Sequence, residues 1–124
     1  MRLAIVSGSS RGLGAALVAR LLQPGDTVIG LARRANPALA TLALERGATL
    51  EQWTVDLAAE PLAAAQRLEA RLLESGGAAW QRAVLINNAG AISTPQPLHD
   101  ARLAELSAVI RVGLEATLLL GAAF

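Results

Sequence analysis

The sequence predicts an α/β fold: an open, doubly wound parallel sheet of about four strands with helices on both faces. Two observations support this prediction. Short apolar runs that each stop at Gly, Asp or Asn are typical of strands buried in a parallel sheet. Segments with helical spacing of apolar residues separate these runs, so strand and helix alternate roughly every 20 to 30 residues. This alternation indicates βαβ units with right-handed crossovers.

Four apolar runs are predicted as strands, at residues 3–6, 27–32, 48–55 and 83–86. The first stops at Ser7 and Gly8, the third at Asp56 and the fourth at Asn87. Polar and glycine-rich segments therefore follow three strands at the point where each ends. Because the carboxyl ends of parallel strands meet at one edge of the sheet, a ligand site is expected there.

Helices are predicted at residues 15–22, 37–46 and 60–74, and from Asp100 to the C-terminus. Gly47 lies where a C-terminal cap is expected, and residues 75–77 close the third helix. Asp100 is of a residue type that caps helix N-termini. The buried stripe of the third helix is predicted to consist of Leu62, Ala65, Leu68 and Leu72.

The composition excludes several classes of protein. The 124 residues are long enough for one domain, 1–124, and with 53% hydrophobic residues the chain is too apolar for disorder. A net charge of +1 does not favour a nucleic-acid partner. No run reaches the about 18 uninterrupted apolar residues of a membrane span. With one His and no Cys, neither a metal site nor a disulfide framework is predicted, and we expect a cytoplasmic protein.

The turn after the first strand has the composition of a phosphate-binding loop, reading SGSSRGLG over residues 7–14. A Gly at the strand end permits a tight turn, and later glycines let backbone N–H groups and the helix N-terminus approach a pyrophosphate. A plain Gly-rich loop is the alternative. The position between a buried strand and a helix favours phosphate binding. The candidate residues are Ser7, Gly8, Ser10, Arg11, Gly12, Leu13 and Gly14.

A second motif, Asn87-Asn88-Ala89-Gly90, follows the fourth strand. Together the two motifs resemble those of the short-chain dehydrogenase/reductase family, TGxxxGxG and NNAG, with Ser7 in place of the family's Thr. The resemblance covers the whole chain and implies a Rossmann-type domain. The family domain is about twice as long, which implies that only its cofactor-binding half is present. In the family, Asn87 is expected to tie the central strands together, and the Ala89-Gly90 backbone to pass along the cofactor ribose.

The end of the second strand indicates which dinucleotide fits. An NAD enzyme places a carboxylate there for the ribose 2′-hydroxyl, and this carboxylate would repel a 2′-phosphate. This chain has Ala32 at that position, followed by Arg33 and Arg34, whose guanidinium groups suit a phosphate. Arg11 would add another cation. NADP(H) is therefore predicted as the cofactor and NAD is less expected; the alternative is a solvated pair of arginines at a strand end.

Asp56, with Leu57 beside it, ends the third strand. The resemblance implies that Asp56 binds the adenine amino group of the cofactor. The alternative, compatible with the first, is that Asp56 caps the helix that begins near Glu60.

The residues that complete the family's reaction are absent or changed. The family reduces a carbonyl by hydride transfer, with a Tyr as proton donor, a Lys that lowers the pKa of that Tyr, a Ser that orients the substrate and an Asn that positions a relay water. This chain has no Tyr, and all eleven of its basic residues are Arg. Gly113 occupies the family's Asn position. We therefore expect no catalytic residue here and no activity from this chain alone.

The last helix is apolar on nearly every side from Val112 onward, which predicts a buried helix. One apolar stripe consists of Leu103, Leu106, Ile110, Leu114 and Leu118, and a second of Val109, Val112, Ala116, Leu120 and Ala123. The fourth strand is expected to expose a sheet edge. We expect a homo-oligomer that associates through this helix or this edge. The end of the chain at Phe124, inside the apolar stretch, indicates truncation.

Three functions are compatible with these observations. The first is an NADP-dependent oxidoreductase of the short-chain type that acts on a small carbonyl or alcohol, represented by its cofactor-binding half. The second is a dinucleotide-binding protein without catalysis, which the missing Tyr and Lys and Gly113 favour. The third is an assembly module that uses the apolar last helix.

Overall fold

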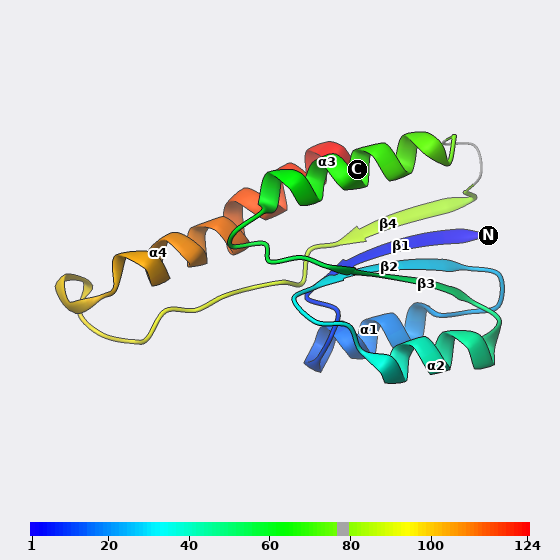
Figure 1. The fold of residues 1–124 in the computed structure, drawn as a ribbon, viewed down its shortest axis with the longest axis horizontal. Helices are drawn as coiled ribbons and strands as arrows, with labels where there is room; N and C mark the ends of the chain where they lie inside the picture. The colour runs from blue at the N-terminus through cyan, green and yellow to red at the C-terminus, as the bar shows by residue number, and fades with distance from the viewer. Residues whose placement is uncertain (77–79) are drawn as a thin grey trace.

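The computed structural model, which describes residues 1–76 and 80–124, contains a four-stranded parallel sheet (Figure 1). Its strands are β1 (Arg2–Ser7), β2 (Thr27–Ala32), β3 (Thr49–Thr54) and β4 (Arg82–Ile86). Their order across the sheet is β3-β2-β1-β4, so the chain winds outward first to one side of β1 and then to the other. This confirms the predicted doubly wound architecture, with β4 at the sheet edge.

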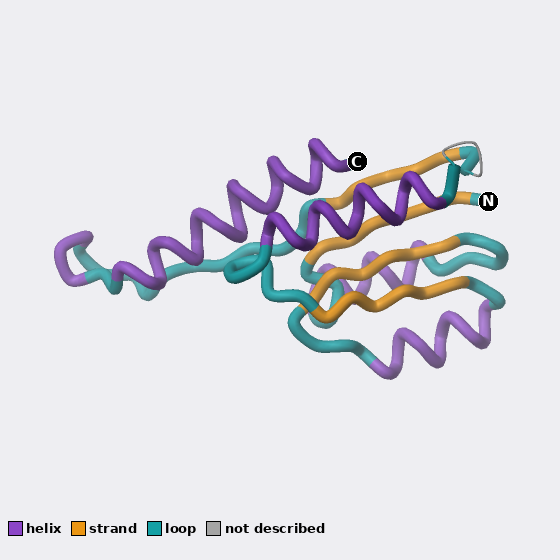
Figure 2. Tube along the Cα trace, turned by 45° about the horizontal axis from the view of Figure 1, so that its top comes forward, coloured by secondary structure: helices purple, strands orange, loops and turns teal. Residues whose placement is uncertain are grey.

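Helices cover both faces of the sheet (Figures 1 and 2). α1 (Gly12–Leu21) and α2 (Pro37–Arg46) lie on one face, and α3 (Pro61–Glu74) and α5 (Ala116–Ala123) on the other. Alternation along each strand creates the two cores, because successive side chains point to opposite faces. Ala4, Val6 and Val28 face α1 and α2, whereas Leu3 and Ile5 face α3 and α5.

The ends of α2 show how local sequence sets the boundaries of a helix. The Asn36 side chain accepts hydrogen bonds from the N–H groups of Ala38 and Leu39, and Pro37 occupies the first turn, where its missing N–H costs nothing. Gly47 follows the last turn with φ of 66°, the left-handed conformation that glycine adopts without strain. The predicted span 37–46 and its glycine cap are confirmed.

The third helix departs from its predicted packing. Its buried residues are Pro61, Ala64, Ala65 and Leu68, and Leu62 is 55% exposed. The predicted stripe was wrong at Leu62, because the face that meets the sheet includes Pro61 and Ala64, each one residue before a predicted position, and Leu62 lies beside that face. Gly76 follows the helix with φ of 66°, whereas Gly77, predicted to close it as well, lies outside the described residues.

The last helix runs without a break through α4 (Leu103–Ile110), a π-helical turn η2 (Arg111–Glu115) and α5. A short 3₁₀ turn, η1 (Leu98–Asp100), precedes it, and Arg102 rather than Asp100 is the N-cap residue. The predicted Asp100 cap was wrong, because Asp100 belongs to the 3₁₀ turn, which ends before the helix begins. In Figure 1, α4 projects beyond the sheet.

The prediction of a buried last helix was also wrong within this chain. Of its two stripes, only the second packs inward, with Ala116 and Leu120 buried against α3 and the sheet. Leu103 is 84% exposed and Leu118 64% exposed. Both residues belong to the first stripe, which we call the outer stripe. No other described element of the chain covers the outer stripe, so it lies on the surface.

By length and composition alone, the helix Leu103–Ala123 is able to cross a membrane, and 11% of its apolar window is buried in this structure. This helix contains no uninterrupted apolar run as long as a membrane span, because Glu105, Arg111 and Glu115 interrupt its apolar residues. The packing of α5 on α3 and the sheet accounts for the inner stripe of this helix.

Candidate nucleotide-binding site

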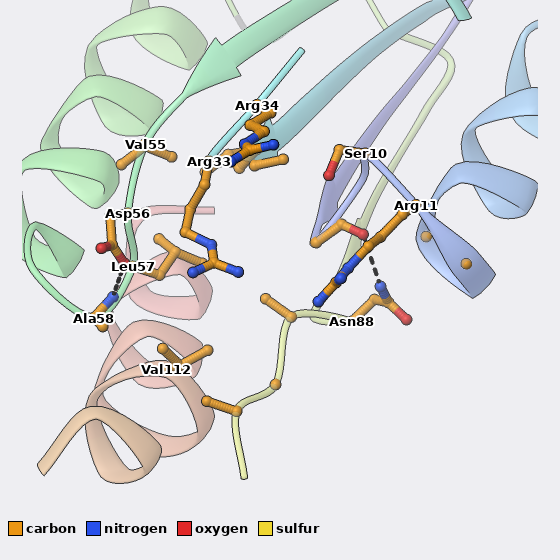
Figure 3. A pocket seen from close by; sticks show the side chains of 18 of the residues that line it. Ser10, Arg11, Arg33, Arg34, Val55, Asp56, Leu57, Ala58, Asn88 and Val112 are labelled. Carbon is orange, nitrogen blue, oxygen red and sulfur yellow. Dashed lines mark hydrogen bonds between the residues drawn. The ribbon is translucent and has the colours of Figure 1, made fainter. Parts of the chain in front are cut away.

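A cleft of about 1230 Å³ opens at the carboxyl ends of the strands, where the sequence predicts a ligand site (Figure 3). Five segments line it: the glycine-rich turn after β1, the arginine segment after β2, the loop after β3, the segment after β4, and the last helix at Ala108 and Val112. Most of the predicted site residues line this cleft, namely Gly8, Ser10, Arg11, Gly12, Leu13, Gly14, Arg33, Arg34, Asp56, Leu57, Asn88, Ala89 and Gly90. Ser7 and Asn87 are the predicted residues that do not.

The glycine-rich turn needs its glycines for two separate reasons. Gly8 and Gly12 have φ of 68° and 56°, in the left-handed region that favours glycine. Gly14 has ordinary helical geometry, but a Cβ there would overlap the carbonyl oxygen of Gly8 and lie 2.7 Å from Asn88 Nδ2. Gly14 thus lets α1 start directly against the turn, which is why α1 begins at Gly12, earlier than predicted.

The N-terminus of α1 faces this cleft without a competing acceptor from its cap residue. Arg11 is the N-cap residue, its side chain makes no capping hydrogen bond, and the first turn of α1 contains no acidic residue. The first N–H groups of a helix have no partner within the helix, and the helix dipole favours an anion near them. Gly12, Leu13 and Gly14 therefore present backbone N–H groups suited to a pyrophosphate.

The ends of β1 and β4 are joined by polar contacts. The Ser7 hydroxyl oxygen accepts hydrogen bonds from the N–H groups of Asn88 at 3.1 Å and Ala89 at 3.0 Å. The Asn88 side chain donates to the Gly8 carbonyl at 3.2 Å. The contacts between the two motifs therefore come from Ser7 and Asn88. Asn87 is exposed, and its role in tying the central strands together stays a prediction.

Arginines supply the positive charge of the cleft. In Figure 3 the side chains of Arg33 and Arg11 point into the hollow from two sides, while Arg34 lies at the end of β2. Within residues 1–76 and 80–124, none of these three arginines forms a salt bridge. Guanidinium groups without a carboxylate partner at the edge of a cleft are suited to an anionic ligand.

Asp56 organises the loop that leads from β3 into α3. Its Oδ1 atom accepts a hydrogen bond from the Ala58 N–H at 2.9 Å, and its carbonyl accepts from Ala59 and Glu60. Glu60 is the N-cap residue of α3, so Asp56 stabilises the preceding turn and does not cap the helix itself. This turn holds the carboxylate at the wall of the cleft, where its Oδ2 atom is available to a ligand.

Sequence reasoning missed several residues of the cleft, of which Asn36, Ala58 and Val112 are the most informative. Asn36 could have been found from the Asn-Pro pair that starts α2. Val112 could not, because its position depends on how the last helix crosses the end of the sheet. Arg111, next to Val112, donates to the Ala58 carbonyl at 3.2 Å and so joins this helix to the loop after β3.

Gly113 lies in the π-helical turn η2, one residue after Val112. A Cβ at Gly113 would meet no atom within 4 Å, and the Thr117 hydroxyl donates to the Gly113 carbonyl at 3.0 Å. π-helical turns are uncommon and occur frequently at functional sites. The backbone at Gly113 is therefore irregular, although Gly113 lacks the Asn side chain that the resemblance implies at this position.

Residues 2–124 match the sequence profile of the family described as short chain dehydrogenase. This chain belongs to that family. The match includes the last helix, so the apolar stretch 103–123 has a counterpart in the family's fold. The recognition that the two sequence motifs supported is confirmed.

Two characterised enzymes are similar in sequence. The (S)-benzoin-forming benzil reductase of Bacillus cereus is 30% identical over 128 residues, which cover 100% of this chain and 49% of that enzyme. The L-xylo-3-hexulose reductase of Hypocrea jecorina (strain QM6a) is 36% identical over 137 residues, which cover 96% of this chain and 45% of that enzyme. The chain therefore spans about half the length of these relatives.

The fold is also shared with solved structures. A metagenomic short-chain oxidoreductase in complex with NADP superposes with a TM-score of 0.84 at 34% identity, covering 99% of this chain and 54% of that protein. This similarity confirms the Rossmann-type α/β fold. It also shows that the chain corresponds to about half of a short-chain oxidoreductase.

Proposed function

We propose that residues 1–124 form the NADP(H)-binding half of an oxidoreductase that interconverts small carbonyl compounds and alcohols. The observation that carries this proposal is the cleft itself, at the carboxyl ends of the strands. The glycine-rich turn, the N-terminus of α1 without a side-chain cap, and arginines that form no salt bridge within the described part of the chain converge there. Family membership and the reductase activities of the two similar enzymes support the reaction class.

In this proposal the first turn of α1 binds the pyrophosphate through the N–H groups of Gly12, Leu13 and Gly14. Asp56 and Leu57 hold the adenine end, and the backbone at Ala89 and Gly90 follows the ribose. The residues present fit a dinucleotide, because Gly12 lines the cleft at the start of α1 and a Cβ there would meet no atom within 4 Å, which leaves open space beside the turn for a pyrophosphate. When bound, the nicotinamide supplies a hydride donor or acceptor.

The preference for NADP over NAD rests on this chain's own arginines. Similar structures contain NADP or NADPH in three cases, and the carveol dehydrogenase of Mycobacterium avium contains NAD. Arg33 points into the cleft, and it directly follows Ala32, the position at which an NAD-binding protein would place a carboxylate. A 2′-phosphate would gain a charge-assisted interaction from Arg33, with Arg11 on the other side.

The chemical step needs groups that these 124 residues do not contain. No Tyr or Lys is available as proton donor or as its activating cation, and Gly113 has no side chain to position a water. We propose that this half binds and orients the nucleotide, and that proton transfer depends on residues outside it. A nucleotide-binding protein without catalysis is the second candidate, and Gly113 is the observation that favours it.

A direct test is a fluorescence titration of NADPH and NADH against the wild-type chain and an Arg33→Ala variant. Because one charge-assisted phosphate contact is lost, we expect the NADPH dissociation constant to rise roughly 10- to 100-fold and the NADH dissociation constant to stay almost unchanged. Arg82→Ala is the matched control, because Arg82 is exposed at the opposite end of the sheet. Equal binding of both nucleotides by the wild type, or no effect of Arg33→Ala, would refute the assignment.

We also propose that the chain self-associates through the exposed stripe of the last helix or through the edge of β4. Ile110 is 57% exposed, Leu114 54% and Leu118 64%, and together they form an exposed apolar patch whose burial would be favourable. Sedimentation velocity should show a concentration-dependent species above the monomer that a Leu114→Glu/Leu118→Glu variant reduces. A wild-type chain that remains monomeric would contradict this proposal, and a variant that associates like wild type would redirect it to β4.

A further inference from the structure

The segment that carries the arginines of the cleft ends at Asn36, whose polar groups are all hydrogen-bonded. Its N–H donates to Gln52 Oε1 at 2.6 Å, and its carbonyl accepts from Gln52 Nε2 at 3.1 Å. Its side-chain Nδ2 donates to the Ser10 carbonyl at 3.0 Å, while Oδ1 caps α2. One residue thus connects three segments around the cleft: the glycine-rich turn, the arginine segment and β3.

Gln52 reaches Asn36 because of its place in the sheet. It is opposite Gly30 in the pairing of β2 with β3, on the face that packs on α1 and α2. A Cβ at Gly30 would lie 2.6 Å from Ser9 Oγ, so the absence of a side chain there lets the glycine-rich turn rest on β2. Gln52 stands beside that contact and binds the Asn36 peptide as a neighbouring strand would.

We propose that Gln52 and Asn36 are positioning residues for nucleotide selection: they hold the segment that bears Arg33 against the turn that bears Arg11, so that both guanidinium groups face one 2′-phosphate. This inference rests on the NADP binding proposed above. Arg33 and Arg34 are joined to no carboxylate within the described chain, so the backbone of their segment is what fixes where they point. The Gln52 amide fixes that backbone at both its donor and its acceptor.

The two nucleotides should depend on this arrangement to different degrees. Both use the N-terminus of α1 and the adenine wall at Asp56, and neither contact passes through Gln52. Only NADPH carries the 2′-phosphate, so only NADPH should lose affinity when the arginine segment becomes free to move. The ratio of the two dissociation constants therefore separates positioning from a general structural role.

The experiment compares wild type with Gln52→Met, which keeps the length of the side chain and removes both hydrogen bonds. We expect the NADPH dissociation constant to rise about tenfold and that of NADH to change less than about twofold. Asn36→Ser keeps an acceptor for the α2 cap but loses the donor to Ser10, and should have a smaller effect in the same direction. Gln66→Met, at an exposed position on α3, is the matched control and should change neither constant.

A second readout needs no nucleotide: amide hydrogen exchange of Asn36 by NMR. The Asn36 N–H should exchange faster in Gln52→Met than in wild type, with exchange in the core of β1 unchanged. Unchanged protection of Asn36, or equal losses for NADPH and NADH, would overturn the positioning role. A wild type without preference for NADPH would instead overturn the proposed function, and with it the role of Gln52 in selection, even if exchange at Asn36 still accelerates.

Discussion

Two regions of this chain are both strongly apolar, but their apolar side chains differ in how far they are buried. In the first, β1 to β3 with α1 and α2, a core encloses Val6, Val18 and Leu22, which are each 0% exposed. In the second, the last helix, α4 has no buried residue and the outer stripe ends in Leu118 at 64% exposure. The projection of α4 beyond the sheet makes the contrast visible (Figure 2).

The difference shows that apolar periodicity predicts which face of a helix should be buried, but not which element or protein chain covers that face. In the first region, α1 and α2 follow β1 and β2 in the chain and cover one face of the sheet, so on that face the partner is close in sequence. The outer stripe of the last helix has no such cover among the described residues. The nucleotide cleft lies mainly in the region whose packing is complete, and only Ala108 and Val112 of the last helix line it.

The largest effect is expected from Gly14→Ala in the first region. The new Cβ would overlap the Gly8 carbonyl oxygen, so the turn or the start of α1 must move, at a cost of about 3 kcal/mol or more. We expect loss of nucleotide binding in a titration and a lower midpoint of urea unfolding. An Ala variant that binds NADPH like wild type would show that the turn is looser than its geometry indicates.

Leu120→Ala should have the next largest effect and locates the border between the two regions. Leu120 is 0% exposed in the contact of α5 with α3 and the sheet, so the truncation should lower the free energy of unfolding by about 2 to 5 kcal/mol. Leu118→Ala, two residues away on the exposed stripe, should change it by less than about 0.5 kcal/mol. Equal effects in urea denaturation would contradict the division of this helix into an inner and an outer stripe.

A pH-dependent contribution is expected in the first region, at Asp26. Arg2 Nε donates to Asp26 Oδ2 at 2.8 Å, and this hydrogen bond holds the pKa of Asp26 below its usual range. A lowered folded-state pKa stabilises the fold above the ordinary value of 3.8, and this stabilisation is lost as the pH falls through the folded-state pKa. Asp26→Asn should therefore be less stable than wild type at neutral pH, with the difference shrinking in acid.

Urea midpoints measured from neutral pH down to about pH 3 test this expectation. Asp100→Asn is the matched control, since the Asp100 side chain is 58% exposed and lies in the 3₁₀ turn before the last helix. A difference between wild type and Asp26→Asn that stays constant with pH would contradict an electrostatic origin.

The smallest effect is expected from Gly113→Ala in the second region. A Cβ there meets no atom within 4 Å, so replacing Gly within a helix should raise the free energy of unfolding by about 0.5 to 1 kcal/mol. Thermal unfolding followed by circular dichroism measures this gain, with Gly14→Ala as the opposite case. Destabilisation would show that the π-helical turn depends on glycine at this position.

The strands, their order of appearance and the glycine-rich turn could be predicted because their signals are local. Apolar runs that end at Gly8, Asp56 and Asn87 mark strand ends, and Gly47 marks the end of α2. The exposure of Leu62 and of the outer stripe of the last helix could not be predicted, because it depends on which elements lie opposite in space. The roles of Asn36, Gln52 and Asn88 escaped prediction for the same reason, since each acts across segments distant in sequence.

The most direct test of the central claim, a nucleotide cleft formed mainly by the first region, is an NMR titration of the wild-type chain with NADP⁺ and with NAD⁺. We expect saturable amide shifts at residues 8–14, 33–36, 56–58 and 88–90, at a lower concentration of NADP⁺ than of NAD⁺. The amide signals of α4 residues outside the cleft should not shift. Shifts confined to the last helix, or no saturable shift with either nucleotide, would contradict it.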